Sequence, residues 1–312
     1  MTRAEVVVTG IGMVTPLGPD AHSTIATWRR GEVACRSRLP ELAGGPYEQA
    51  EAATFILPPA DGRVGNPRLL KYASTAGVLG CLAAAEAARD AAIRERFRPE
   101  RIGLYAGSGM AASNVGESVP MVARSLDEHG DFSAALLGSS GIGATNPLTA
   151  FKILSNMAPC LVSMMENIQG PSLIFTPWEG QTAAALWEAW SAVASGEVDC
   201  ALAGAAEEAT NPACLVYLRS SGRLQANEFA AAAAAYVVFE RLETARRAYA
   251  RIRSMSVTCT GSAACDPLAT RMGRTFAAAP AVLLALACAD PCTITLTGTD
   301  GCRFTAELEA AA

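Results

Sequence analysis

The stretch Gln169–Leu186 (QGPSLIFTPWEGQTAAAL) constrains the fold of this chain more than any other segment. A Gly-Pro turn precedes Ser172–Thr176, whose composition predicts a buried strand. Pro177–Gly180 then makes a tight corner, and a helix rich in Ala, Leu and Trp runs towards Gly196. A corner residue of this kind lies at the helix N-terminus, where free N–H groups and the helix dipole favour an anion or a nucleophile. The corner residue is Glu179, so the role of this carboxyl group is the central question.

The composition excludes several classes of partner. The 312 residues are 51% hydrophobic and 18% charged, with a formal net charge of −5. This low charge content predicts that part of the surface is covered by another protein. The chain has no basic run and no apolar run that could span a bilayer, so we expect neither nucleic acid nor a membrane as a partner. Because MTRAEVVVTG leads directly into a strand, we expect no signal peptide and a cytoplasmic location.

The cysteines and histidines do not follow the spacing of a metal site. There are ten cysteines but no CxxC pair, and the two histidines, His22 and His129, lie far apart. We therefore expect no metal, and we expect the cysteines to be small buried hydrophobic residues. The glycines Gly10, Gly12 and Gly18 do not match the G-x-G-x-x-G spacing of a dinucleotide loop. The sequence therefore predicts no bound cofactor.

Apolar runs and turn residues predict an alternation of strands and helices along the chain. Strands are expected at Glu5–Ile11, Arg101–Ser108, Ser172–Thr176, Asp199–Gly204, the end of Ala230–Phe239, Ala250–Thr258, and in a hairpin of Thr293–Thr299 and Cys302–Glu307. Helices are expected at Ala21–Gly31, Pro67–Arg96, Asn146–Ile168, after the corner, at Glu240–Tyr249, and at Pro267–Ala289 with a break at Pro280. Ala205–Ala209, which holds Glu207 and Glu208, is predicted to be a loop. This rhythm predicts an α/β fold with a mainly parallel sheet covered on both faces.

Five segments resemble, in chain order, the β-ketoacyl synthase family of the thiolase-like superfamily. They are VVVTGIGMVTPLG, RIGLYAGSGM, NPLTAFKILSNMAPCLVSMMENIQGPS, SGEVDCALAGAAEE and AAYVVFERLETARRAYARI. The resemblance runs from Glu5 to Val257 and is weaker beyond. It implies a thiolase-like layered αβαβα fold with residues 1–312 as a single domain. The N-terminal half, residues 1–205, then contains the corner, and residues 206–312 form a shortened C-terminal half.

The departures from the family pattern are informative about function. The resemblance places the catalytic cysteine of an active synthase at the corner, where this chain has Glu179. It also implies two histidines in the second half, yet no histidine follows His129. A synthase-like chain without these groups is similar to a chain-length factor, the inactive partner of a ketosynthase in discrete-subunit polyketide systems. The acidic corner and the short form most resemble partners from reduced or polyene pathways, such as those for aryl polyenes.

The resemblance also implies how such a subunit pairs with its partner. Ser172–Thr176 would pair with its counterpart in an active ketosynthase, so that the sheet continues across a heterodimer. An acyl tunnel would lie at that interface, and plain core packing is the alternative for each candidate lining residue. These are Met110, Phe151, Met157, Met164, Phe175 and Trp178. Because both this chain and an acyl-carrier protein are acidic, we expect the carrier to dock on the partner, so that this chain contacts it only indirectly.

Three roles remain open for Glu179. It is a structural plug bonded to corner N–H groups, a partner for a basic group across the interface, or a catalytic base or malonyl decarboxylase. The first two are favoured, because a decarboxylase would need polar donors for the enolate. The corresponding alternatives for the whole protein are a rewired acyltransferase or decarboxylase using Glu179 or Cys160, and a pure scaffold that binds other subunits.

Overall fold

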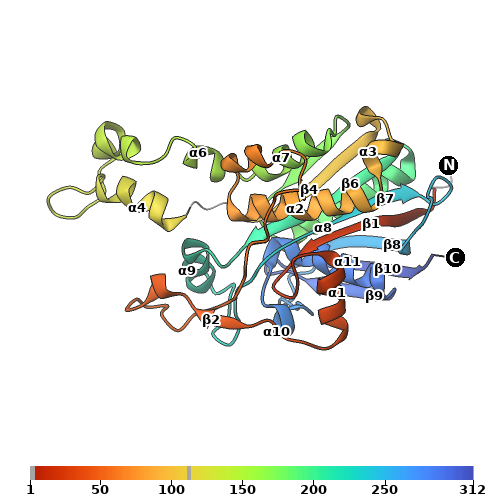
Figure 1. Cartoon of the computed structure of the whole chain (residues 1–312). Coiled ribbons are helices and arrows are strands. Elements are labelled where there is room, and N and C mark those ends of the chain that lie inside the picture. Colours follow the sequence, from red (N-terminus) through yellow and green to blue (C-terminus); the bar gives the residue numbers. More distant parts are fainter. Residues whose placement is uncertain (1–3, 111–113, 312) are drawn as a thin grey trace.

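The sheet at the centre of the protein has eight strands. The computed structural model describes residues 4–110 and 114–311. In spatial order the sheet contains β5 (Ser172–Phe175), β4 (Ile102–Ser108), β6 (Cys200–Glu208), β7 (Ala232–Arg241), β1 (Val6–Val14), β8 (Ala250–Cys259), β10 (Cys302–Ala310) and β9 (Thr293–Thr297) (Figure 1). A separate two-stranded ribbon joins β2 (Arg36–Arg38) to β3 (Glu51–Ala53). The predicted hairpin of the last two strands is confirmed.

Helices cover both faces of the sheet, which confirms the α/β fold class. On one face α2 (Thr75–Asp90) contacts β1, β6 and β7, with α7 (Met157–Glu166) beside it. On the other face α8 (Glu179–Ser195) and α11 (Ala279–Ala289) contact both the central strands and β10. Small residues bring these layers very close together, because a Cβ on Gly12 would lie 1.9 Å from the carbonyl oxygen of Ala83 in α2.

The prediction of a mainly parallel sheet is wrong. Only β4 pairs in parallel, with β5 on one side and β6 on the other. The other neighbouring strands of the sheet are antiparallel. A strand–helix–strand order along the chain produces a parallel pair only when the two joined strands lie side by side in the sheet. Here β1 lies between β7 and β8 and runs antiparallel to both.

Several predicted helices are divided in the structure. The Pro67–Arg96 helix is interrupted before α2, where the Ser74 hydroxyl caps the helix by accepting from the Gly77 N–H. It ends where Ala92 takes a left-handed conformation, before α3 (Ile93–Arg96). The Asn146–Ile168 segment contains α6 (Thr149–Lys152) and α7 instead of one helix. Near the C-terminus α10 (Ala269–Met272) is separate, and α11 starts beside Pro280, in agreement with the predicted break there.

The described residues between β7 and β8 form no helix, so the helix predicted at Glu240–Tyr249 is wrong. The strand instead continues through Glu240, whose side chain is 0% exposed. Both carboxylate oxygens of Glu240 accept from the Arg96 guanidinium, at 2.7 and 2.6 Å, and the Thr9 hydroxyl donates at 2.5 Å. The charge pattern of this segment is helix-like, but long-range bonds to distant residues hold the backbone in the strand.

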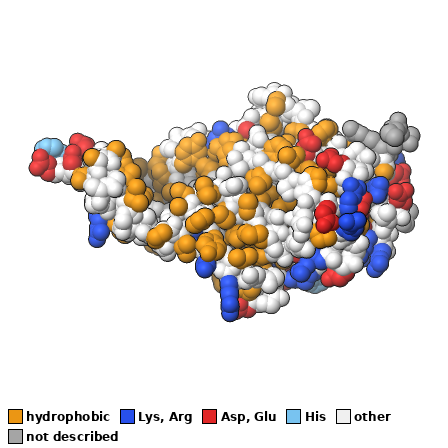
Figure 2. Space-filling view, turned by 90° about the horizontal axis from the view of Figure 1, so that it is seen from above, with side chains coloured by type: hydrophobic (Ala, Val, Ile, Leu, Met, Phe, Trp, Pro, Cys, Tyr) orange, Lys and Arg blue, Asp and Glu red, His pale blue; other side chains and the backbone are white. Residues whose placement is uncertain are grey.

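An arm, defined here as residues 114–156, projects from the body (Figure 1). It contains α4 (Val115–Ala123), α5 (Ala134–Leu136) and α6, whereas α1 (Ala21–Arg29) and α9 (Pro212–Ser220) pack on the body. Figure 2 shows apolar side chains spread over the arm and the adjoining body, with most charged side chains at the opposite end. Among residues 4–110 and 114–311, every helix is too short or too polar to span a bilayer.

Strand β5 lies at the edge of the sheet and follows the arm and α7 in the chain. The sequence predicts a buried strand there, but Leu173 is 43% exposed and Ile174 is 37% exposed. The prediction of burial is wrong for the single chain, because β5 has a neighbour only on the β4 side. An exposed apolar edge strand presents unpaired backbone groups that can pair with another chain.

Candidate functional site

Glu179 begins α8 at the corner predicted from the sequence, and it is 2% exposed. The Thr299 hydroxyl donates to Glu179 Oε2 at 3.0 Å. Burial raises the pKa of this carboxyl group, while the backbone N–H groups of Glu179 and Thr299 oppose the shift and the Asp300 charge adds to it. The carboxyl group is therefore held by the helix N-terminus on one side and by the β9–β10 loop on the other.

The loop Gly298–Gly301 (GTDG) closes over the corner. Asp300 Oδ2 accepts from the Gly180 N–H at 2.9 Å. A Cβ on Gly298 would lie 2.7 Å from the Cβ of Glu179, so the backbone of the loop packs directly on this side chain. These contacts come from within the chain and leave the Glu179 side chain almost inaccessible to solvent.

A second buried carboxyl group, that of Glu207, lies close enough for the Glu179 charge to raise its pKa further. Glu207 is 1% exposed, and its Oε1 accepts from the Glu208 N–H at 3.0 Å, while Oε2 has no hydrogen-bond partner. Burial, the largest cause, raises the pKa of Glu207 to about 8. The predicted loop at Ala205–Ala209 is wrong because β6 continues through both glutamates. The sequence shows the Glu-Glu pair but not the burial of its first member.

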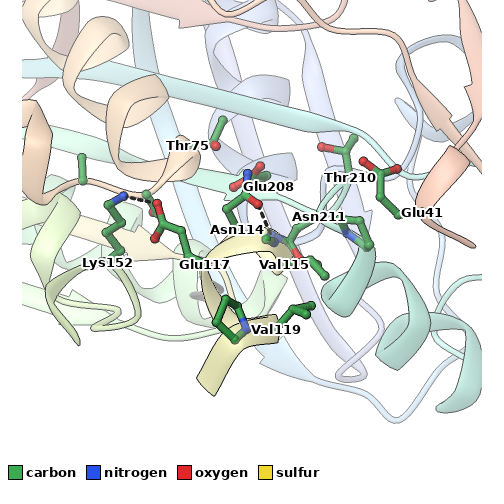
Figure 3. A pocket seen from close by; sticks show the side chains of 15 residues that line it. Glu41, Thr75, Asn114, Val115, Glu117, Val119, Lys152, Glu208, Thr210 and Asn211 are labelled. Atoms are coloured by element: carbon green, nitrogen blue, oxygen red, sulfur yellow. Dashed lines mark hydrogen bonds and ion pairs between the residues drawn. The ribbon is translucent and has the colours of Figure 1, made fainter. Parts of the chain in front are cut away.

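A cavity with a volume of about 800 Å³ lies between α2, α4 and the start of α9 (Figure 3). Lys152 Nζ is 2.7 Å from Glu117 Oε1 on one wall, and the Thr149 hydroxyl donates to the same carboxylate. Glu208 lines another wall, where burial raises its pKa to about 7 against the effect of a bond from Thr75. Polar and charged side chains line the cavity together with Val115, Val119 and Pro120, and none of the six predicted tunnel residues lines it.

The structure brings together only two of the six predicted tunnel residues. Met110 and Trp178 pack against the same apolar cluster, and Trp178 also stacks on Tyr217 and lies under the Arg223 guanidinium. Met157 packs against the cluster around α2, and Phe175 packs against the cluster around α8. The remaining two candidates, Phe151 and Met164, are exposed at the surface.

The two imidazoles and the thiol of Cys160 lie on elements away from the corner carboxyl group, and one other thiol is an exception. His22 lies on α1, and His129 is exposed in the arm. Cys160 is exposed on α7, on the opposite face of the sheet from α8. The exception is Cys302, which follows the GTDG loop. Among the residues that the structure describes, no group of three or more His, Cys, Asp or Glu side chains could hold a metal ion.

The expectation that the cysteines are buried is correct for only some of them. Four thiols are buried and that of Cys302 is partly exposed. The expectation is wrong for the five that are exposed, because Cys160 lies on an outward-facing side of α7 and the others lie in loops or at a strand end: Cys35, Cys259, Cys265 and Cys292.

Two curated proteins show sequence similarity over about two thirds of the chain. One is the putative 3-oxoacyl-[acyl-carrier-protein] synthase, mitochondrial, of Schizosaccharomyces pombe, at 26% identity over 217 residues, which are 67% of this chain and 47% of that protein. The other is the 3-oxoacyl-[acyl-carrier-protein] synthase, mitochondrial, of Arabidopsis thaliana, at 29% identity over 228 residues, 66% of this chain and 45% of that protein. The chain thus matches a little under half the length of these relatives.

Solved structures share the fold. A chain of the AntDE:AntF complex, a type II PKS acyl-carrier protein with its ketosynthase bound to the hexaketide, matches with a TM-score of 0.77 and 15% identity, covering 99% of this chain and 100% of that one. A chain of the ishigamide ketosynthase/chain length factor matches with a TM-score of 0.75 and 15% identity, and the match covers 99% of this chain and 100% of that chain. A β-ketoacyl synthase from Burkholderia phymatum STM815 matches with a TM-score of 0.67 and 19% identity, and the match covers 85% of this chain and 66% of that chain.

These similarities agree with the central sheet, the covering helices and the strand–corner–helix geometry around Glu179. The family described as "Beta-ketoacyl synthase, N-terminal domain" matches residues 3–240, which is most of the chain. The chain therefore belongs to the β-ketoacyl synthase family.

Proposed function

We propose that this protein is a non-catalytic chain-length factor that pairs with an active ketosynthase in a type II polyketide system. The observation behind this proposal is the buried carboxyl group of Glu179 at the corner, bonded to Thr299 and covered by the GTDG loop. Condensation needs a thiolate to hold the acyl group and donors to stabilise an oxyanion. The carboxyl group of Glu179 cannot act as this thiolate, and neither histidine lies at the corner to donate to an oxyanion, because His22 is on α1 and His129 is in the arm.

The exposed apolar surface supports a partner subunit. The edge of β5 can continue the sheet into a second chain, and it lies beside an apolar face that a lone soluble protein rarely exposes. Exposed apolar side chains on β5, α7 and the arm include Val119, Phe151, Leu154, Met164, Leu173 and Ile174. Phe151 and Met164 thus have a role at the interface in this proposal even though they line no cavity in the single chain.

We also propose which products this subunit serves and which subunit binds the carrier protein. The acidic corner fits a subunit for reduced or polyene chains, in which Met110 and Trp178 contact the acyl chain and limit its length. The ketosynthase subunit binds the acyl-carrier protein, and this chain contacts the carrier only indirectly. The solved neighbours that join a ketosynthase to a chain length factor or to a carrier protein support this assembly as a proposal for this chain.

Co-expression with a candidate ketosynthase, followed by native mass measurement, tests the proposal. We expect a one-to-one complex that extends acyl chains, and an unchanged rate of malonyl decarboxylation when Glu179→Gln is introduced. Trp178→Ala is expected to lengthen the products, whereas a matched change at Tyr249, an exposed aromatic residue beside Asp90, should leave product length unchanged.

Two other results would overturn the proposal. A stable homodimer that decarboxylates malonyl thioesters alone, and loses this activity in Glu179→Gln, would identify an enzyme. Complex formation with product length unaffected by every change at Met110 and Trp178 would identify a scaffold.

A further inference from the structure

Two thiols face each other on neighbouring strands at the edge of the corner. Cys259, the last residue of β8, is in register with Cys302, the first residue of β10. Their Sγ atoms are 3.3 Å apart, and both thiols are free. They are separated by 43 residues in the sequence, so only the pairing of β8 with β10 brings them together.

The backbone geometry at this pair suits a covalent bond. At the next position the Thr260 N–H donates to the Gly301 carbonyl oxygen at 3.0 Å. Pairs with and without such hydrogen bonds alternate in an antiparallel ladder, so Cys259 and Cys302 form a pair without them. In that type of pair the Cα atoms are about 4.5 Å apart, which is inside the range of about 4.4–6.8 Å that disulfides span. Rotation of the side chains alone can therefore close the bond.

The two thiols differ in their access to solvent. Cys259 is exposed, so a small reagent can reach its sulfur. Cys302 is partly covered by the corner, because a Cβ on Gly180 would lie 2.7 Å from its Sγ. Burial, the contact with Cys259 and the Asp300 charge raise the pKa of Cys302. The difference in access makes Cys259 the first nucleophile and Cys302 the resolving thiol.

We propose that Cys259 and Cys302 are a reversible disulfide site that exchanges with low-molecular-weight disulfides of the glutathione type. The Cys259 thiolate attacks one sulfur of the reagent, forming a mixed disulfide and releasing one thiolate. That thiolate takes the Cys302 proton, and the Cys302 sulfur then attacks Cys259 Sγ and expels the second small group as a thiolate, which takes from the solvent the proton that Cys259 had released. The two protein thiols are oxidised to one disulfide, and the reagent is reduced to two thiols.

This bond would act on the loop that holds the corner carboxyl group. The Cys302 N–H donates to Asp300 Oδ1 at 3.1 Å, and Asp300 Oδ2 accepts from the Gly180 N–H at the start of α8. The disulfide would join β8 to the residue that follows this loop and so restrain the cover over Glu179. Disulfides in reducing compartments are usually transient, which fits a regulatory bond. The site does not depend on the proposed chain-length function.

Equilibration of the purified protein, in its native assembly, with glutathione and glutathione disulfide at several ratios tests the proposal. We expect a loss of about 2 Da in intact mass, reversed by excess reduced thiol, as two thiols become one disulfide. Peptide mapping should identify a peptide that links Cys259 to Cys302. Cys259→Ser should prevent the change, and Cys160→Ser, at another exposed thiol, should leave it intact.

Three results would contradict a reversible disulfide between Cys259 and Cys302. A stable glutathione adduct at Cys259 without closure to Cys302 would overturn the proposal, as would a disulfide that maps to other cysteines. An unchanged mass at the most oxidising ratio would also overturn it. The mapping is done on the native sequence, so the result does not depend on whether a variant folds.

Discussion

Replacing Glu207 with glutamine is expected to change how the stability of the protein depends on pH. Glu207 lies at the end of β6 with 1% of its surface exposed, and one of its carboxyl oxygens has no hydrogen-bond partner. Burial raises its pKa from an ordinary 4.5 to about 8 in the folded protein. The folded state therefore keeps a proton that the unfolded chain releases at much lower pH.

The size of the effect follows from this difference in pKa. The Glu207 contribution to stability is fully present below the unfolded pKa of 4.5 and is lost as pH rises through the folded value of about 8. Between these values the free energy of unfolding falls by about 1.4 kcal/mol per pH unit. From about pH 6 to about pH 8.5 the loss amounts to about 2.5 kcal/mol, or about 5 °C in Tm.

Urea unfolding at a series of pH values measures this contribution. In Glu207→Gln the fall in stability over that range should be smaller by about 2.5 kcal/mol. Other buried carboxyl groups with raised pKa values, Glu208 and Glu166, keep a residual slope in the variant. Glu128→Gln is the control, because this side chain is 87% exposed, and it should leave the profile unchanged. If Glu207→Gln and the native protein lose stability in parallel, the buried neutral carboxyl group is refuted.

Three further changes test other parts of the argument. Arg96→Ala leaves the Glu240 carboxylate buried without its cation and should cost about 3–5 kcal/mol in the free energy of urea unfolding; a loss below about 1 kcal/mol would contradict the buried ion pair. Thr299→Val removes a donor to Glu179 and should cost about 1–3 kcal/mol by thermal unfolding, while an unchanged Tm would show that this bond is unimportant. Ile174→Lys places a charge on the β5 edge; gel filtration should show loss of the ketosynthase complex with an unchanged Tm for the chain alone, and an intact complex would exclude β5 from the interface.

Local patterns in the sequence determine a large part of this fold. The Val-rich β1, the corner at Glu179 with the helix that ends at Gly196, and the Asp-Gly hairpin near the C-terminus are predicted correctly. Each of these elements depends on residues that are close together in the chain, such as a turn glycine or an apolar run. The position of a carboxyl-bearing residue, Glu179, at the corner is also visible in the sequence.

Only the tertiary structure decides how distant segments act on one another. Glu240 belongs to a helix-like charge pattern, but Arg96 and Thr9 hold it in a strand. The pairing of β1 with β7 and β8 makes the sheet largely antiparallel, although the rhythm of elements predicts the opposite. The burial of Glu207 and the meeting of Cys259 with Cys302 likewise depend on strands brought together by folding. These features need long-range contacts, and local propensity carries no information about which distant partner a residue will meet.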